Sequence, residues 1–307
     1  MGKALVLRGG ALGDFVLTLP TIRLMAEGLP KAEVEVMGYA PMIQLAELAG
    51  LAVATKRIEH VGLASFFVPG AELDPEWCAY FESFDVIVSY LSDPHGIFKG
   101  NLIRAGVGET DYFPAIAQVS ADATHGHAVE QLARPLESIG LFLDDPVPSL
   151  NLSGGGMRSG VAIHPGSGSA SKNWSRASWK ELALELAGNL PAGEEVAVVS
   201  GEAEEEWIDE WLADLRGDGV NVASWRMESL TDLAAKLAGV RAFVGHDTGT
   251  SHLAAAAGAP TVALFAPTDP AVWRPMGDHV TALRAEDGDW SRLSVADVLA
   301  AARERMG

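Results

Sequence analysis

One polar turn late in the chain carries the clearest chemical signal. The segment Phe243–Pro275 predicts a buried strand, a polar turn from His246 to His252, a helix of small residues and a second buried strand. Parallel α/β sheets bind ligands at the carboxyl ends of their strands, which is where this turn falls. Thr248 to Ser251 would present free backbone N–H groups at the helix start, an arrangement that favours phosphate. The turn therefore predicts an anion-binding site.

A second loop, His164–Trp174, follows another predicted strand and is rich in serine and glycine. Ser167, the neighbouring glycines and Lys172 fit a phosphate cradle with one cation to balance the charge. The alternative is an exposed Ser/Gly loop with a solvated lysine, and the loop alone does not separate the two. Together with the Thr248 turn, it could hold one diphosphate from two sides.

A third turn, Arg8–Asp14, joins the first predicted strand to the first predicted helix. It matches neither the G-x-G-x-x-G dinucleotide pattern nor a Walker loop. Asp14 stands at the helix start, beside glycines that permit close approach of the backbone. It is either an N-cap, a position that aspartate favours, or a general base that projects into an interdomain cleft.

Two short patterns resemble metal ligands and favour another explanation. Asp287-Gly288-Asp289 lies in a glycine-rich linker near the end of the chain. His125-Gly126-His127 has no cysteine or third ligand nearby, so it is better explained as a turn before a helix. We therefore expect no metal.

Composition limits the classes of function. The chain has 307 residues, a net charge of −19 and one cysteine. The negative charge is shared by both halves, which disfavours binding to nucleic acid or anionic lipid. The single cysteine, with no signal peptide or long apolar run, favours a cytoplasmic protein with at most peripheral membrane contact.

Strand and helix patterns alternate twice along the chain and predict an α/β protein of two Rossmann-like domains that face each other across a cleft. We expect domain boundaries at 1–153 and 154–290, with a hinge at Ser153–Gly156 and a C-terminal helix, 291–307, that packs back on the first domain. Strands are predicted at Lys3–Leu7, Val34–Met37, Asp85–Tyr90, Gly160–His164, Val196–Ser200 and Val220–Ala223. Helices are predicted at Asp14–Glu27, Met42–Ala49, His127–Ile139, Ser178–Ala187, Ala203–Leu215, Ser229–Leu237 and Ser294–Arg305.

Three segments together resemble glycosyltransferase family 9, the ADP-heptose:lipopolysaccharide heptosyltransferases. They are Leu7–Pro20, Ile163–Trp174 and Val244–Phe265. The resemblance implies a GT-B fold, with the acceptor on the first domain and the nucleotide-sugar on the second. It also implies an inverting, metal-independent glycosyltransferase that uses no cofactor besides its nucleotide-sugar co-substrate, an ADP-linked heptose.

The resemblance assigns roles by position. Asp14 matches the family's catalytic base, Ser167 and Lys172 match its diphosphate loop, and Asp247 matches a residue near the donor sugar. Glu205 resembles the glutamate that holds the ribose, because it follows Gly201 by four residues, whereas the other glutamates from Glu202 to Glu206 are expected on a solvated helix face. Met227 matches a position that lines the adenine in the family. The phosphate-facing turn comprises Thr248, Gly249, Thr250 and His252.

The acceptor is less defined by sequence. The family's acceptor is a lipopolysaccharide core, which would place the enzyme at the inner face of the bacterial inner membrane. The first half, however, offers only scattered basic residues, Lys56, Arg57, Lys99, Arg104 and Arg134, so a neutral saccharide or another surface glycan stays open. The alternative functions are a nucleotide-sugar epimerase or hydrolase of the same fold and a non-catalytic nucleotide-sugar-binding protein.

Overall fold

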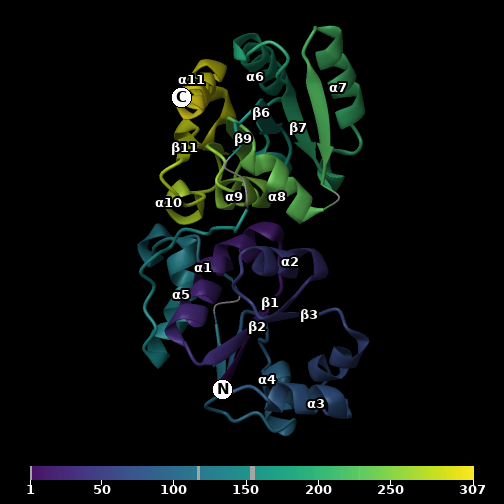
Figure 1. Cartoon of the computed structure of the whole chain (residues 1–307), viewed down its shortest axis with the longest axis vertical. Helices are drawn as coiled ribbons and strands as arrows, with labels where there is room; N and C mark the ends of the chain where they lie inside the picture. The colour runs from purple at the N-terminus through teal and green to yellow at the C-terminus, as the bar shows by residue number, and fades with distance from the viewer. Residues whose placement is uncertain (1, 116–117, 153–155, 228) are drawn as a thin grey trace. The chain divides into compact units, whose positions relative to one another are not determined.

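The computed structural model describes residues 2–115, 118–152, 156–227 and 229–307. It divides into two compact units, each built on one parallel sheet (Figure 1). The first unit comprises Met1–Ser120 and Ala128–Pro146, and the second comprises Ala121–His127 and Val147–Gly307. The predicted boundary at residue 153 lies a few residues after this division, and the predicted hinge at 153–156 lies mostly outside the described residues.

The first unit contains a five-stranded parallel sheet in the order β3-β2-β1-β4-β5. Its strands are β1 (Gly2–Arg8), β2 (Ala32–Gly38), β3 (Ala54–Arg57), β4 (Val86–Ser89) and β5 (Tyr112–Pro114). Its helices are α1 (Leu12–Gly28), α2 (Ala40–Leu48), α3 (Pro75–Glu82), α4 (Ile97–Arg104), α5 (Ala128–Ala133) and the 3-10 helices η1 (Val61–Phe67) and η3 (Arg134–Ile139).

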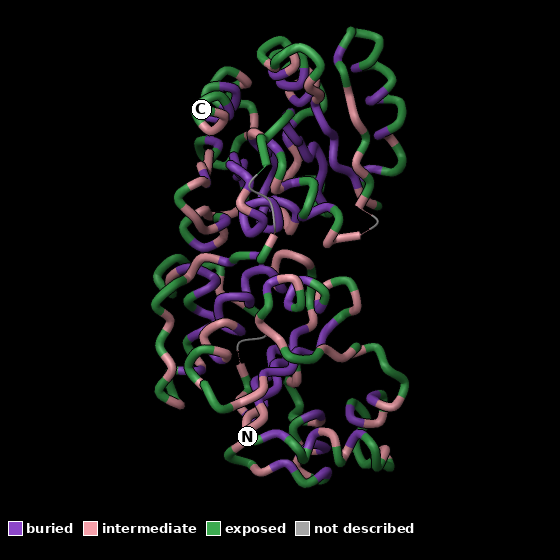
Figure 2. The backbone as a smooth tube through the Cα atoms, in the orientation of Figure 1, coloured by how far each residue is buried: buried purple, intermediate pink, exposed green. Residues whose placement is uncertain are grey.

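Continuous burial along β1 and α1 explains why this sheet forms. Ala4 to Leu7 of β1 are fully buried, as expected for a central parallel strand that is covered on both faces. The helix α1 buries Phe15 to Ile22, including Pro20 within the helix, and packs against α5. Buried residues appear in Figure 2 along the strands and on the inner sides of the helices. Burial on this scale fixes the turn between β1 and α1, which carries Asp14.

The second unit contains a six-stranded parallel sheet in the order β11-β10-β9-β6-β7-β8. Its strands are β6 (Val161–His164), β7 (Val196–Ser200), β8 (Val222–Arg226), β9 (Ala242–His246), β10 (Thr261–Phe265) and β11 (Val280–Arg284). Its α-helices are α6 (Arg176–Asn189), α7 (Ile208–Gly217), α8 (Leu230–Ala238), α9 (Gly249–Ala256), α10 (Pro270–Trp273) and α11 (Val295–Met306), and its 3-10 helices are η2 (Ala123–His125), η4 (Ala170–Lys172), η5 (Glu202–Glu204), η6 (Glu286–Gly288) and η7 (Trp290–Arg292).

The C-terminal helix α11 contributes to the core of the second unit. Val298 and Ala302 are fully buried in the same apolar cluster as Trp179 of α6 and Val262 of β10. Figure 1 shows α11 beside α6, in agreement with the contacts between them. The buried face of this helix therefore serves the second unit, and its predicted packing on the first unit stays a prediction.

Two predicted helices are each divided in the structure. The segment His127–Ile139 forms α5 and then the 3-10 helix η3, because Pro135 lacks the N–H that an α-helix would use. The segment Ala203–Leu215 begins as a short 3-10 helix, η5, and becomes α-helical only from Ile208. No helix among the described residues is long and apolar enough to cross a bilayer.

Candidate active site

Two adjacent strands bring the predicted anion-binding loops together. β6 and β9 pair in parallel, with His164 opposite Gly245. The loops that follow them, 165–175 and 247–248, therefore leave the same edge of the sheet side by side. Because parallel α/β proteins bind ligands at this edge, the sequence-predicted turn and loop meet where a site is expected.

Lys172 and Asp247 form the centre of this site. The ammonium Nζ lies 2.7 Å from Asp247 Oδ2 and 3.2 Å from the Asp247 carbonyl oxygen. Thr268, after β10, donates its hydroxyl to the same carboxylate oxygen over 2.7 Å. His252 Nε2 lies 3.9 Å from the other oxygen, Oδ1. Asp247 is buried whereas Lys172 is partly exposed, so the carboxylate holds one side of a cation that still faces outward.

His246 fixes the loop that carries Lys172. Its Nε2 accepts the backbone N–H of Trp174 over 2.8 Å, and its Nδ1 lies 3.3 Å from the Gly166 carbonyl oxygen. Burial lowers the pKa of His246 to about 3, although the hydrogen bond to Gly166 opposes this shift. The imidazole is therefore neutral at pH 7, with its proton at Nδ1 directed to Gly166. It ties both ends of the loop to β9.

The helix α9 begins directly after Asp247. Thr248 is its N-cap in extended conformation, and Gly249 and Thr250 form its first turn. The first N–H groups of a helix lack intrahelical acceptors and attract anions. The following run of alanines, 254–256, is buried, and α9 packs directly on β9 and β10. Small side chains thus let this positive helix end approach the sheet edge beside Lys172.

The other predicted donor residues surround this centre. Ser167 is buried within its own loop, with its Oγ 2.8 Å from Ser169 O and 2.6 Å from Asn173 Oδ1, so the hydroxyl holds the loop's shape. Thr250 Oγ1 lies 3.6 Å from Met227 Sδ, which brings the predicted adenine residue to the start of α9. Glu205 is exposed at the end of η5, after β7. These residues lie after adjacent strands of one sheet, while Asp14 lies in the other unit.

Glu204 is a site residue that the sequence analysis placed incorrectly. We expected this glutamate on a solvated helix face, but its side chain is buried. Its Oε2 accepts the Gly201 N–H over 2.7 Å and lies 3.7 Å from His164 Nε2. The sequence signal for this contact is the glycine at position 166, because a Cβ there would overlap Glu204 Oε1. Only the folded structure shows that these two positions meet.

In the first unit, Asp14 is the third residue of α1. Its Oδ2 accepts the backbone N–H of Ala11 over 3.1 Å, so Ala11 is the N-cap and Asp14 caps from within the first turn. Arg8 Nη2 lies 3.5 Å from Asp14 Oδ1, and the Arg8 guanidinium lies over the buried Tyr90 ring, 5.3 Å from its centroid. The Asp14 side chain is 42% exposed. A carboxylate held by two contacts and open to solvent can serve both as a cap and as a base.

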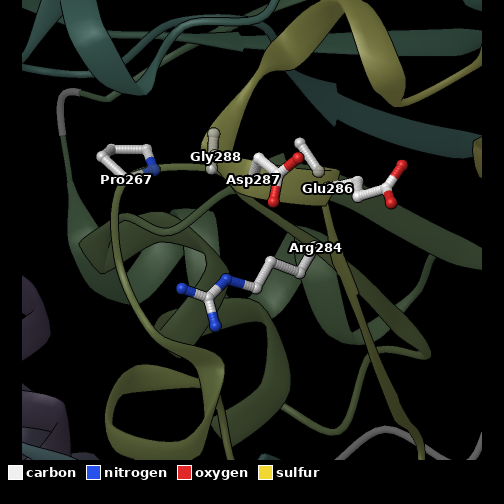
Figure 3. Close-up of a pocket in the computed structure, with 7 residues that line it drawn as sticks. Pro267, Arg284, Glu286, Asp287 and Gly288 are labelled. Atoms are coloured by element: carbon white, nitrogen blue, oxygen red, sulfur yellow. The ribbon is translucent and has the colours of Figure 1, made fainter.

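A pocket of about 560 Å³ lies beyond the carboxyl ends of β10 and β11 (Figure 3). Its charged groups are Arg284, Glu286 and Asp287. Asp287 pairs with Arg292 over 2.8 Å, and Asp289 caps the next helix turn by accepting the Ser291 N–H. The Asp287-Gly288-Asp289 pattern is thus used structurally. Within the described ranges, no cluster of three His, Cys, Asp or Glu could hold a metal ion.

Comparison with known families identifies the family of the chain. The family model described as glycosyltransferase family 9 (heptosyltransferase) matches residues 130–299, which include Lys172 and Asp247. The chain belongs to glycosyltransferase family 9. It is therefore a glycosyltransferase, and the loops described above belong to the matched region.

Relatives of this glycosyltransferase agree with the assignment. Lipopolysaccharide heptosyltransferase 1 of Pseudomonas aeruginosa is 27% identical over 293 residues, which cover 87% of this chain and 79% of the relative. Lipopolysaccharide heptosyltransferase 1 of Salmonella typhimurium is 35% identical over 127 residues, which cover 41% of this chain and 38% of the relative.

Solved structures match over almost the whole length. E. coli heptosyltransferase WaaC with ADP has a TM-score of 0.73 at 20% identity, over 99% of each chain. A family 9 glycosyltransferase from Veillonella parvula has a TM-score of 0.78 at 15% identity, over 99% of this chain and 97% of that one. These matches establish the GT-B fold, in agreement with the two parallel-sheet units.

Proposed function

We propose that this glycosyltransferase transfers heptose from ADP-heptose to a lipopolysaccharide-core acceptor, with inversion at the anomeric carbon and without a metal ion. The names of its relatives support the sugar and the acceptor, since these proteins are lipopolysaccharide heptosyltransferases. One related solved structure holds ADP-2-deoxy-2-fluoro heptose. The main structural support for the proposal is the Lys172–Asp247 contact beside the start of α9, where a diphosphate could bind.

The donor diphosphate would lie between Lys172 and the first turn of α9. Departure of ADP leaves negative charge on the diphosphate. Hydrogen-bond donors that are already fixed at that position stabilise this charge without reorganisation. The Lys172 ammonium has three N–H groups, and its contacts with Asp247 leave donor capacity for a phosphate oxygen. Lysine and the helix end thus supply the positive charge that a metal supplies in other transferases.

The nucleoside would extend toward β7 and β8. Gly201 follows β7 and Met227 follows β8, and an added Cβ at Gly201 would overlap the Met227 methyl. A thioether is a soft apolar surface suited to a purine ring. The exposed Glu205 carboxylate, on the same loop as Gly201, would accept hydrogen bonds from the ribose hydroxyls.

The reaction would be a single displacement. The acceptor hydroxyl oxygen attacks the anomeric carbon from the face opposite ADP, and its proton passes to the Asp14 carboxylate. The bond between the anomeric carbon and the diphosphate oxygen breaks, and its electron pair leaves with ADP. Arg8 and the Ala11 N–H orient Asp14, which leaves its carboxylate ready to accept a proton from a bound hydroxyl.

The acceptor would bind the first unit, at the inner face of the inner membrane. Two of the scattered basic residues have partners already: Lys56 lies 4.7 Å from the Tyr80 ring centroid, and Arg104 donates to Asn101 and Ala71. Arg57 and Lys99 are exposed and are available to the negative groups of a lipopolysaccharide core.

A transfer assay tests this proposal directly. The protein is incubated with ADP-heptose and a lipopolysaccharide that lacks heptose, with and without EDTA, and the products are separated by mass. We expect one added heptose, equal yield with EDTA and inverted anomeric configuration by NMR. Consumption of ADP-heptose without acceptor would indicate a hydrolase or epimerase. Transfer from a UDP- or GDP-sugar in preference to ADP-heptose would overturn the donor.

A further inference from the structure

Two buried polar atoms beside the donor loops are left without hydrogen-bond partners among the described residues. They are Nε2 of His164 and Oε1 of Glu204. His164 is 3% exposed and Glu204 is 1% exposed. Buried polar atoms in native proteins nearly always have a hydrogen-bond partner. Neither atom takes part in the transfer chemistry proposed above. The burial of these two polar atoms beside the donor loops therefore needs a separate explanation.

The two side chains connect three loops of the site. Glu204 Oε2 accepts the Gly201 N–H at the end of β7, and Oε1 faces Gly166, where only a glycine leaves it room. His164 Nε2 lies 3.7 Å from Glu204 Oε2, and His164 Nδ1 lies 3.5 Å from the Thr248 hydroxyl. The pair thus contacts the predicted ribose loop, the diphosphate loop and the first residue before α9.

We propose that Glu204 and His164 form a positioning pair that couples the ribose loop to the diphosphate-binding turn. This role rests on the function proposed above. With its proton at Nε2, His164 faces the Glu204 carboxylate and leaves Nδ1 as an acceptor for the Thr248 hydroxyl. The direction of that hydroxyl is then set by Glu204, and Glu205, the next residue, is held by the same anchored turn. Neither member of the pair touches the reacting atoms.

The charge on Glu204 is consistent with this role. Burial raises the pKa of Glu204, but the nearby His164 imidazole, 3.7 Å away, and the Gly201 N–H together outweigh it and hold the pKa below its usual value. The carboxylate is therefore ionised at pH 7. A glutamine of the same shape would keep its amide oxygen on the Gly201 N–H but would carry no charge. It would therefore hold the imidazole proton at Nε2 less strongly and orient the Thr248 hydroxyl less firmly.

A double-mutant cycle on ADP affinity tests whether Glu204 and His164 act as a pair. ADP dissociation constants are measured by calorimetry for the wild type, Glu204→Gln, His164→Gln and the double variant, with a melting temperature for each. We expect each single change to weaken ADP binding by about tenfold, and the double variant to be no weaker than the worse single one, because the two residues act as a unit. In kinetics, the KM for donor rises while the KM for acceptor is unchanged.

A control and an independent measurement keep the outcomes distinct. Glu194 pairs with Arg241 through two contacts, 2.8 and 2.7 Å long, before β7 and β9, at the opposite edge of the same sheet. Glu194→Gln should lower the melting temperature and leave ADP affinity intact. In addition, the ¹⁵N shifts of the His164 imidazole, assigned with His164→Gln, should show an Nε2–H tautomer in the wild type and a smaller share of that tautomer in Glu204→Gln, without any ligand.

Three results would overturn the role. Effects of Glu204→Gln and His164→Gln that multiply in the double variant would show that they act independently. An unchanged His164 tautomer in Glu204→Gln would show that the carboxylate does not set the proton position, even if variants fold poorly. ADP affinity equal to the wild type in both single variants would exclude a part in donor binding. A wild type that fails to bind ADP would instead overturn the proposed donor, and this role with it.

Discussion

Asp14 and Lys172 carry opposite charges and differ in how tightly their side chains are held. Lys172 is drawn against the buried Asp247, whereas the Asp14 carboxylate is nearly half exposed and held by one N–H and one guanidinium. The cation is therefore placed before any ligand arrives, while the carboxylate is oriented but accessible. This difference gives the two residues different expected effects on binding and turnover.

Replacing Asp14 by Asn should lower kcat by about 10²- to 10⁴-fold, because a general base contributes on this order. ADP affinity should stay within twofold of the wild type, since Asp14 lies in the first unit and the donor loops lie in the second. Steady-state kinetics and calorimetry measure the two quantities. Glu27→Gln, an exposed change on the same helix, is the control and should leave both unchanged. Wild-type turnover in Asp14→Asn would remove the base.

Replacing Lys172 by Met should lower kcat by about 10²- to 10³-fold, as observed when one stabilising donor is removed from a developing charge. Donor affinity should fall as well, because the ammonium would contact the ground-state diphosphate. Lys180→Met is a matched control: this lysine of α6 pairs with the surface residues Asp214 and Asp218, and its removal should not affect activity. Equal activity of the two variants would show that Lys172 is a surface lysine.

Residue types predicted part of the site because their chemistry is local. A lysine in a Ser/Gly loop and a threonine–glycine turn before small residues both indicate phosphate, and the structure brings Lys172 to the Asp247 turn. Glu204, Arg8 and Thr268 could not be found in this way. Their roles depend on contacts with residues far away in sequence, and one glutamate in an acidic run looks like the next until burial separates Glu204 from Glu205.

At the scale of elements, the turn between β1 and α1 determines where Asp14 points. Gly10 has φ +95°, a conformation that L side chains rarely adopt. An added Cβ there would also lie 2.8 Å from Asp14 Oδ2. The carboxylate therefore occupies space that only glycine leaves open. The geometry of the turn and of Asp14 therefore requires glycine at position 10.

Gly10→Ala should cost about 1–2 kcal/mol of unfolding free energy from the backbone conformation and should also displace Asp14. Gly70→Ala isolates the first effect, because Gly70 has φ +69° with no atom within 4 Å of an added Cβ. Denaturant unfolding and kinetics are compared for both variants. We expect similar losses of stability, with a fall in kcat only for Gly10→Ala. A fall in kcat of the same size in both variants would contradict this account.

Elements were predictable where burial is continuous or strictly periodic. β7 was predicted at Val196–Ser200 and has those bounds, because all five of its residues are buried and apolar or small. The edge strands β3, β5 and β11 were missed. They are short or only partly buried, so neighbouring strands rather than their own sequence define them. The break at Pro135 was missed because the apolar spacing continues through it.

At the scale of the molecule, one buried histidine should link stability to pH. His246 has a folded pKa of about 3, below the unfolded value of 6.5. Between these values the unfolded chain binds the extra proton, so stability falls as the pH decreases from 6.5 towards 3 and is fully present above 6.5. One such proton contributes at most about 1.4 kcal/mol per pH unit.

Chemical unfolding of the wild type and His246→Gln between pH 4 and 8 tests this linkage, with pH chosen at roughly half-unit steps across the window. The variant should be less stable throughout, because it loses the contacts with Trp174 and Gly166. Its stability should also depend less steeply on pH below 6.5. Parallel curves for the two proteins would show that His246 does not titrate in this window.

The path of the backbone between the two units has a practical consequence. Residues 121–127 belong to the second unit although both flanking stretches belong to the first, so the chain passes between units after Ser120, after His127 and after Pro146. A fragment that stops at residue 153 would carry His127 away from the Arg274 carbonyl that its ring contacts over 2.9 Å. A fragment that starts at residue 154 would lack Leu150, whose N–H bonds to Ala256 O. Separating the two units therefore requires cutting the chain at three places, and a single cut near the middle of the gene leaves each fragment without contacts that its unit needs.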